Sequence, residues 1–405
     1  MEEPRFPAGL TRSGMLQQLM DHISDNIYFK DREGRIVLLS QWGARWYGYD
    51  SPDEVLGKTD EDLFTAEHAT GARADELRVM ETGEPVTGIE EKETWAGGRE
   101  TWASTTKMPL RDDNGNIVGI FGISRDITAQ KEHELLIQRM KEQMEAELHR
   151  ASEVQRSFLS ARRVRFPESP VAGAGSIHVI HEYRPSGPVG GDFFCLLPLS
   201  DTRVGIFIAD VMGHGVGAAL TMSALNAMVR SEAARLENPD EFLQRLNRRL
   251  REVISREDEF EFITAFYLVI DTADGITRYA TAGHPAPLVI RAETKRAERL
   301  FERGELGGPA LMLMKEPVFM TGGNRLAPGD RLLLFTDGIT EMPCRADGGE
   351  DIGIDGLIDW LNEHPADVLA DLVGGVTTAV LSLSKSIAFK DDVCLVGVEF
   401  EEAQR

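Results

Sequence analysis

The stretch from Thr128 to Ser160 contains neither glycine nor proline and is rich in Glu, Gln, Lys and Arg. It predicts one long helix, because glycine and aspartate turns break the sequence repeatedly on either side of it. At about 1.5 Å per residue this helix would be roughly 50 Å long, enough to separate two domains. A chain of 405 residues can also hold two hydrophobic cores. We therefore expect a domain at residues 10–128, a linker helix at 129–165 and a larger domain at 176–402.

Apolar residues of this stretch recur at alternating spacings of three and four residues, once Glu147 is accepted as an interruption. They are Ile137, Met140, Met144, Ala151, Val154 and Phe158. This pattern is typical of a coiled-coil seam, and a parallel two-stranded coil would make the protein a homodimer. A single amphipathic helix lying on a neighbouring domain is the alternative.

The balance of charges limits the possible partners. Acidic residues outnumber basic ones by 67 to 44, which gives a formal charge of −23. This disfavours nucleic acid and anionic membranes as partners and suits hard metal cations. The N-terminal sequence has no signal pattern, and the uncharged apolar stretch from Leu372 to Ser384 is too short to cross a bilayer. We expect a cytoplasmic protein.

The N-terminal region alternates short apolar runs with turn residues. Asp31 to Gly34 and Asp112 to Gly115 are turn sequences between strand-like segments, as in antiparallel hairpins. These features predict a small α+β domain. The hairpin pattern, closed by the Asp-Ile-Thr sequence that ends at Thr128, resembles the PAS sensor family.

The ligand of this domain cannot be assigned from the sequence. Six aromatic residues could line a pocket, although core packing explains most of them. They are Trp42, Trp46, Tyr47, Tyr49, Trp95 and Trp102. The region has no cysteine, which excludes a flavin-cysteinyl adduct, and haem ligation through His22 or His68 has no supporting pattern.

The C-terminal region has consecutive strand-like runs with few helices between them, which favours antiparallel sheets covered by helices. The strand-like runs are RVGIFIAD, FITAFYLVID, ITRYATAGH, RLLLFTDG and VCLVGVEF. The helical runs are Gly217 to Leu236, Asp240 to Ile254 and Ala366 to Ser384.

Acidic residues stand at the ends of four apolar runs. They are Asp192 in VGGDFF, Asp210 in FIADVMGHG, Asp337 in LLLFTDGITE, and Asp391 with Asp392 in FKDDVCLV. Any one of them alone is adequately explained as a turn residue. Four together predict a Mg²⁺ or Mn²⁺ site, because carboxylates at strand ends are held rigidly and hard cations prefer oxygen ligands. Two adjacent cations in such a site suit phosphoester hydrolysis.

Five motifs occur in the order found in the SpoIIE-like branch of the metal-dependent, type-2C-like serine/threonine phosphatases, and this region resembles that family. They are VGGDFF, ADVMGHGVGAAL, TAGHPAPLVI, LLLFTDGITEM and DDVCLV. The resemblance implies an α/β/β/α sandwich of two antiparallel sheets flanked by helices. It also implies a substrate: phosphoserine or phosphothreonine on an anti-sigma-factor antagonist of the STAS type, in a partner-switching pathway.

The resemblance assigns roles to individual residues. Asp210 would bridge two Mn²⁺ or Mg²⁺ ions, and the Val211 carbonyl would add a backbone ligand. Asp337 and Asp391 would complete the second metal, and Asp192 would hold its own metal directly or through water. Five glycines would let the backbone turn sharply and approach the ions. They are Gly190, Gly191, Gly213, Gly215 and Gly338.

The sequence departs from the family pattern beside Asp192. Relatives often carry an Arg-Glu pair before VGGD and an aspartate after the two aromatic residues, where this chain has Gly187, Pro188 and Cys195. A catalytically inactive pseudophosphatase that only binds its phosphoprotein is therefore the alternative function. A structural dimer scaffold would leave the five motifs unexplained.

Other chemistries have less support. His214 and His284 could act as general acids, but we favour structural roles for both. The cysteines Cys195, Cys344 and Cys394 are too far apart for a zinc or disulfide pattern, and none lies in a Cys-x5-Arg loop. The GGDFF sequence lacks the acidic residue of the GGDEF signature, and the other motifs have no place in a diguanylate cyclase.

Overall fold

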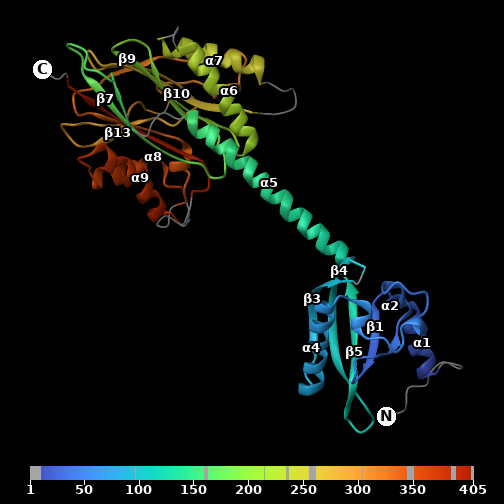
Figure 1. Ribbon diagram of the computed structural model, residues 1–405. Helices are drawn as coiled ribbons and strands as arrows, with labels where there is room; N and C mark the ends of the chain where they lie inside the picture. The colour runs from blue at the N-terminus through green and yellow to red at the C-terminus, as the bar shows by residue number, and fades with distance from the viewer. Residues whose placement is uncertain are drawn as a thin grey trace. The chain divides into compact units, whose positions relative to one another are not determined.

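The computed structural model describes residues 11–95, 97–158, 163–213, 215–233, 237–254, 261–302, 304–343, 351–384 and 389–402 (Figure 1). The chain divides into two compact units, Met1–Gln143 and Met144–Arg405. None of the helices within the described residues is long and apolar enough to cross a membrane.

The first unit is built on an antiparallel sheet with strand order β2-β1-β5-β4-β3. The strands are β1 (Asn26–Asp31), β2 (Ile36–Leu39), β3 (Val86–Thr94), β4 (Glu100–Arg111) and β5 (Ile117–Asp126). The helices are α1 (Arg12–His22), α2 (Gln41–Trp46), α3 (Asp60–Leu63) and α4 (Ala66–Thr82), with a 3-10 turn at Pro52–Glu54. Both predicted hairpins are present, since the Gly34 amide donates to the Asp31 carbonyl and the Gly115 amide to the Asp112 carbonyl.

Aromatic residues fill the core of the first unit. Trp46 and Trp95 are buried, and their ring centroids lie 6.4 Å apart. Trp42, Tyr47 and Tyr49 pack against the same cluster. These five of the six aromatic residues are therefore used in packing.

A buried group of charges lies in the same unit, which the sequence did not predict. The Lys30 ammonium on β1 lies 2.6 Å from a carboxylate oxygen of Asp60 and 2.6 Å from one of Glu76. All three residues are buried. The cation is needed there, because an unpaired carboxylate in a protein interior carries a large desolvation cost.

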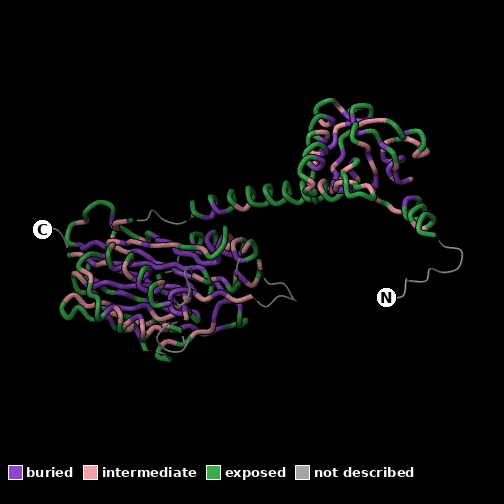
Figure 2. The backbone as a smooth tube through the Cα atoms, turned by 90° about the horizontal axis from the view of Figure 1, so that it is seen from below, coloured by how far each residue is buried: buried purple, intermediate pink, exposed green. Residues whose placement is uncertain are grey.

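The helix α5 (Thr128–Phe158) occupies most of the predicted linker. Its only buried residues are Ser152 and Gln155 near its C-terminal end, and Figure 2 shows most of its remaining length as exposed. Most apolar residues of the predicted seam are exposed in the single chain: Ile137 is 66% exposed and Met144 is 65% exposed. Phe158, the last of them, is instead partly buried against the core of the second unit.

The second unit is a four-layer sandwich, which confirms the predicted fold class. Two antiparallel sheets, ordered β14-β11-β10-β9-β8 and β13-β12-β15-β16-β7-β6, pack on each other through a buried hydrophobic layer. A second apolar layer joins the first sheet to α6 and α7, and a third joins the other sheet to α8 and α9 (Figure 1). The helices are α6 (Val216–Ala233), α7 (Pro239–Val253), α8 (Gly353–Glu363) and α9 (Leu369–Leu383).

The strands of the first sheet are β8 (Phe193–Pro198), β9 (Arg203–Val211), β10 (Ile263–Asp271), β11 (Ile276–Ala282) and β14 (Gly322–Arg325). Those of the second sheet are β6 (Arg163–Phe166), β7 (Ser176–Arg184), β12 (Leu288–Ile290), β13 (Ala297–Arg299), β15 (Arg331–Phe335) and β16 (Val393–Glu401). A 3-10 turn, η2 (Asp337–Ile339), follows β15.

Candidate active site

Four aspartates stand at strand ends that meet at one edge of the sandwich. Asp192 directly precedes β8, and Asp210 is the last but one residue of the antiparallel neighbour β9. In the other sheet, Asp337 follows β15, and Asp391 stands just before the antiparallel neighbour β16. Because one strand of each pair ends where the other begins, each sheet brings two carboxylates to the same edge.

These carboxylates are close enough to perturb one another. Burial and the neighbouring Asp210 raise the pKa of Asp192 well above its usual range. Burial, followed by repulsion from Asp337 and Asp391, raises the pKa of Asp210 to about 7, although a hydrogen bond with Asp192 partly offsets these effects. Burial raises the pKa of Asp337 to about 6, with added repulsion from Glu341 and Asp391. Ionising all of these carboxyl groups together is therefore unfavourable unless a cation lies beside them.

Thr336 fixes the most buried of these carboxylates. The Asp192 side chain accepts a hydrogen bond of 2.6 Å from the Thr336 hydroxyl, whose oxygen in turn accepts from the Cys394 amide at 2.9 Å. The hydroxyl therefore ties the loop before β8 to both β15 and β16. Sequence reasoning missed Thr336, although its position directly before Asp337 was a possible signal.

The two adjacent aspartates before β16 have different environments. Asp391 is exposed and contributes to the repulsion at Asp210 and Asp337. Asp392 is 3% exposed and accepts hydrogen bonds from the Ser186 amide and hydroxyl and from the Gly191 amide. The arrangement leaves Asp391 available to a ligand, while Asp392 holds the loop before β8. That loop-holding role was not foreseen.

Three of the predicted glycines, Gly190, Gly191 and Gly338, stand where no side chain fits. A Cβ atom on Gly338 would lie 2.0 Å from the Asp392 carbonyl oxygen, and one on Gly191 would lie 2.8 Å from the Val211 carbonyl oxygen. The absence of a side chain at Gly191 lets the segment of Asp192 approach that of Asp210, and its absence at Gly338 lets the segment of Asp337 approach that of Asp391.

The donor set fits a hard divalent cation in its chemistry. It offers carboxylate oxygens and the Val211 carbonyl, and no Lys or Arg side chain of the described residues forms an ion pair with the four aspartates. As the side chains stand, however, the described residues contain no group of three or more His, Cys, Asp or Glu that could hold a metal ion.

The predicted histidines and cysteines contribute little to this chemistry. His284 is buried, with Nδ1 at 2.9 Å from the Thr264 hydroxyl, and burial lowers the pKa of its ring to about 3. A ring that stays neutral supports the structural role. Burial raises the pKa of Cys195 to about 12 and that of Cys394 above its usual value, which disfavours thiolate chemistry. His214 and Cys344 lie outside the described residues.

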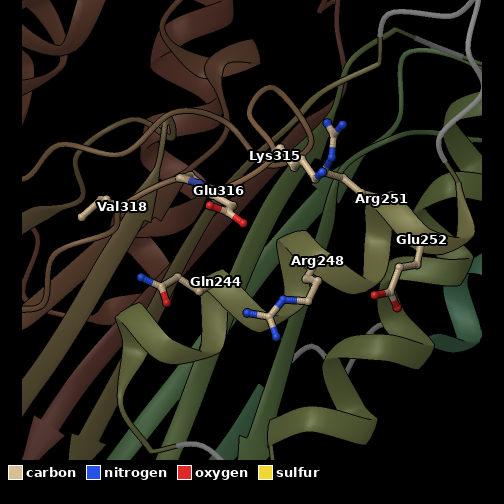
Figure 3. A pocket seen from close by; sticks show the side chains of 8 residues that line it. Gln244, Arg248, Arg251, Glu252, Lys315, Glu316 and Val318 are labelled. Atoms are coloured by element: carbon tan, nitrogen blue, oxygen red, sulfur yellow. The ribbon is translucent and has the colours of Figure 1, made fainter.

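A separate cleft of about 790 Å³ lies between α7 and the segment 315–318. Figure 3 shows Gln244, Arg248, Arg251 and Glu252 on the helix, with Lys315, Glu316 and Val318 across from them. None of the predicted metal ligands lines this cleft, so it is distinct from the acidic edge.

Two antiparallel sheets between helical layers, with carboxylates gathered at one edge of the sandwich, are the features to be compared with known proteins. In that comparison, residues 200–401 match the family described as Stage II sporulation protein E (SpoIIE), and residues 20–132 match a PAS fold family. The chain therefore combines a PAS domain with a SpoIIE-type phosphatase domain.

Two curated relatives come from Bacillus subtilis (strain 168). The chain is 25% identical over 263 residues to phosphoserine phosphatase RsbP, covering 65% of this chain and 60% of RsbP. It is 27% identical over 270 residues to phosphoserine phosphatase RsbU, covering 66% of this chain and 74% of RsbU. The SiaA PP2C domain of Pseudomonas aeruginosa shares the fold, with a TM-score of 0.53, 18% identity, and coverage of 65% of this chain and 99% of that domain.

Proposed function

We propose that the protein is a signal-regulated phosphatase that hydrolyses phosphoserine or phosphothreonine on another protein. The observation that carries this proposal is the set of four mutually repelling carboxylates at one edge of a PP2C-type sandwich. Buried or half-buried carboxylates without cationic partners are costly to keep together, and they are typical of sites that bind divalent cations.

Two Mn²⁺ or Mg²⁺ ions would be held by the carboxylates of Asp192, Asp210, Asp337 and Asp391 and by the Val211 carbonyl. Bound there, the ions would place positive charge beside the phosphoryl oxygens. They would also lower the pKa of a bound water molecule to near neutral. The chain itself restricts Asp192 through Thr336 and keeps the space between the strand ends free of side chains at Gly191 and Gly338. Asp391, which is exposed, would be the ligand most accessible to solvent and substrate.

The proposed substrate is a phosphorylated antagonist of an anti-sigma factor, of the STAS type. Support comes from the family resemblance and from the relatives RsbP and RsbU, both of which are named phosphoserine phosphatases. Dephosphorylation would release a sigma factor by partner switching. The PAS domain would supply the signal, and its ligand is not assigned.

The helix α5 is the proposed link between signal and hydrolysis. Its apolar residues Ile137, Met140, Met144 and Val154 are each more than half exposed, which favours pairing with the same helix of a second copy. The proposed active form is therefore a homodimer through a coiled coil.

The experiment that tests the function measures phosphate release from p-nitrophenyl phosphate and from a phosphoserine STAS protein, with Mn²⁺, Mg²⁺ or a chelator. Asp337→Asn should abolish metal-dependent turnover. Asp201→Asn, which removes an exposed turn carboxylate outside the cluster, should keep it. A well-folded wild-type protein that binds the phosphoprotein without releasing phosphate would contradict the proposal and favour the pseudophosphatase.

A further inference from the structure

The last turns of α5 are attached to the loop that leads into the acidic cluster. Gln155 is 4% exposed, although most of the helix around it is solvated. Its side-chain Nε2 donates to the Gly190 carbonyl at 2.5 Å, and its Oε1 accepts from the Gly190 amide at 3.1 Å. One side-chain amide thus satisfies both backbone groups of a single residue.

The same loop is held from its other side by Asp392. The Gly191 amide donates to Asp392 Oδ2 at 2.5 Å, and the Ser186 amide donates to Oδ1 at 2.6 Å. The next residue along the chain is Asp192, which Thr336 fixes. An unbroken series of hydrogen bonds and peptide bonds therefore runs from α5 to the first carboxylate of the cluster.

The loop has little freedom to move without breaking these contacts. A Cβ atom on Gly190 would lie 2.4 Å from the Tyr183 hydroxyl oxygen and 2.5 Å from Asp392 Oδ2. Because Gly190 is buried and closely surrounded, loss of the Gln155 amide would leave its N–H and C=O without the two hydrogen bonds that they now make.

Only a glutamine-type side chain of this length serves both groups. An ionised glutamate would still accept from the Gly190 amide but could not donate to its carbonyl, and an alanine would do neither. Gln155 also directly follows Val154, a residue of the exposed apolar seam, so the helix turn that carries the seam carries this contact as well.

We propose that Gln155 is a positioning residue for the metal site: it holds the 186–191 loop, and through that loop it sets where Asp192 stands. Metal affinity then depends on a side chain of α5 that touches neither metal nor substrate. The identity of the cations in this inference rests on the proposed function. The positioning of the loop by Gln155 does not depend on that function.

The test compares Gln155→Glu and Gln155→Ala with Glu153→Gln, a control that alters an exposed side chain of the same helix by one charge. Calorimetric titration of each full-length, metal-free protein with MnCl₂ should show about tenfold weaker binding for both Gln155 variants, equivalent to about 1.4 kcal/mol. Hydrogen exchange measured without metal should be faster in the peptide that covers residues 186–192. The control should match the wild type in both measurements.

The two measurements separate the possible failures. Wild-type Mn²⁺ affinity and wild-type exchange in both Gln155 variants would overturn the positioning role. If the wild type itself binds no Mn²⁺, the proposed function and the metal part of this inference both fall, while the metal-free exchange still decides whether Gln155 holds the loop. Far-UV circular dichroism of each variant shows whether a change reflects global unfolding instead.

Discussion

Glu93 on β3 should make the stability of the PAS domain depend on pH. Its side chain is buried, with 5% exposed, and it accepts a hydrogen bond of 2.8 Å from the Thr101 hydroxyl. Burial raises the pKa of Glu93 from 4.5 to about 7, and the charges of Glu91 and Asp126 add to this effect. The Thr101 hydrogen bond opposes the rise without cancelling it.

The direction of the pH dependence follows from whether the folded or the unfolded state binds the Glu93 proton more tightly. The folded domain holds a proton on Glu93 up to a higher pH than the unfolded chain does. The stabilisation from this group is therefore complete below pH 4.5 and is lost as the pH rises through about 7. The difference between the two pKa values corresponds to about 3 kcal/mol in the free energy of unfolding.

Comparing Glu93→Gln with the wild type isolates this contribution, because glutamine keeps an acceptor for Thr101 and does not titrate. Urea unfolding of the full chain can be followed by tryptophan fluorescence, since four of the five tryptophans, Trp42, Trp46, Trp95 and Trp102, lie in the first unit. Relative to the variant, the wild type should lose about 2.5 kcal/mol between about pH 5 and pH 8, because part of the full difference is already lost at pH 5. Parallel curves for the two proteins across this range would refute the reasoning.

Two further substitutions test the packing on which each unit depends. Lys30→Met leaves the buried carboxylate of Asp60 without its cation and leaves Glu76 with Arg73 alone. It should destabilise the PAS domain by about 3–5 kcal/mol in urea unfolding, whereas Lys92→Met, at an exposed ion pair, should cost about 1 kcal/mol or less. Equal losses in the two variants would show that the buried ion pairs contribute no more to stability than the exposed one. Gly338→Ala places a Cβ atom 2.0 Å from the Asp392 carbonyl oxygen, so it should lower the free energy of unfolding by about 1–3 kcal/mol and remove most of the phosphatase activity. The control Gly374→Ala, in open space on α9, should be neutral or slightly stabilising. An active, stable Gly338→Ala protein would contradict the close approach of the segments that follow β15 and precede β16.

The regular elements were predicted well where burial and periodicity coincide. The helix α7 is Pro239–Val253, against a prediction of Asp240 to Ile254, because its apolar residues repeat on one face. The sequence did not predict the helix α8, Gly353–Glu363, because it contains Gly353 and Gly356 and glycine is more typical of loops than of helices. Packing of Leu357 and Leu361 against the second sheet stabilises this helix instead.

The sequence by itself determined the two-domain plan, the long helix between the domains and the four aspartates at strand ends. Strand propensity, glycine turns and the absence of helix breakers are local properties, so they can be read from neighbouring residues. The tertiary structure alone decided which of two adjacent aspartates faces solvent and which holds a loop, and that Thr336 and Gln155 meet that loop. Gln155 and Gly190 are far apart in the chain, and no local pattern encodes their contact, because it arises only when the helix α5 and the sheets pack around the same buried backbone.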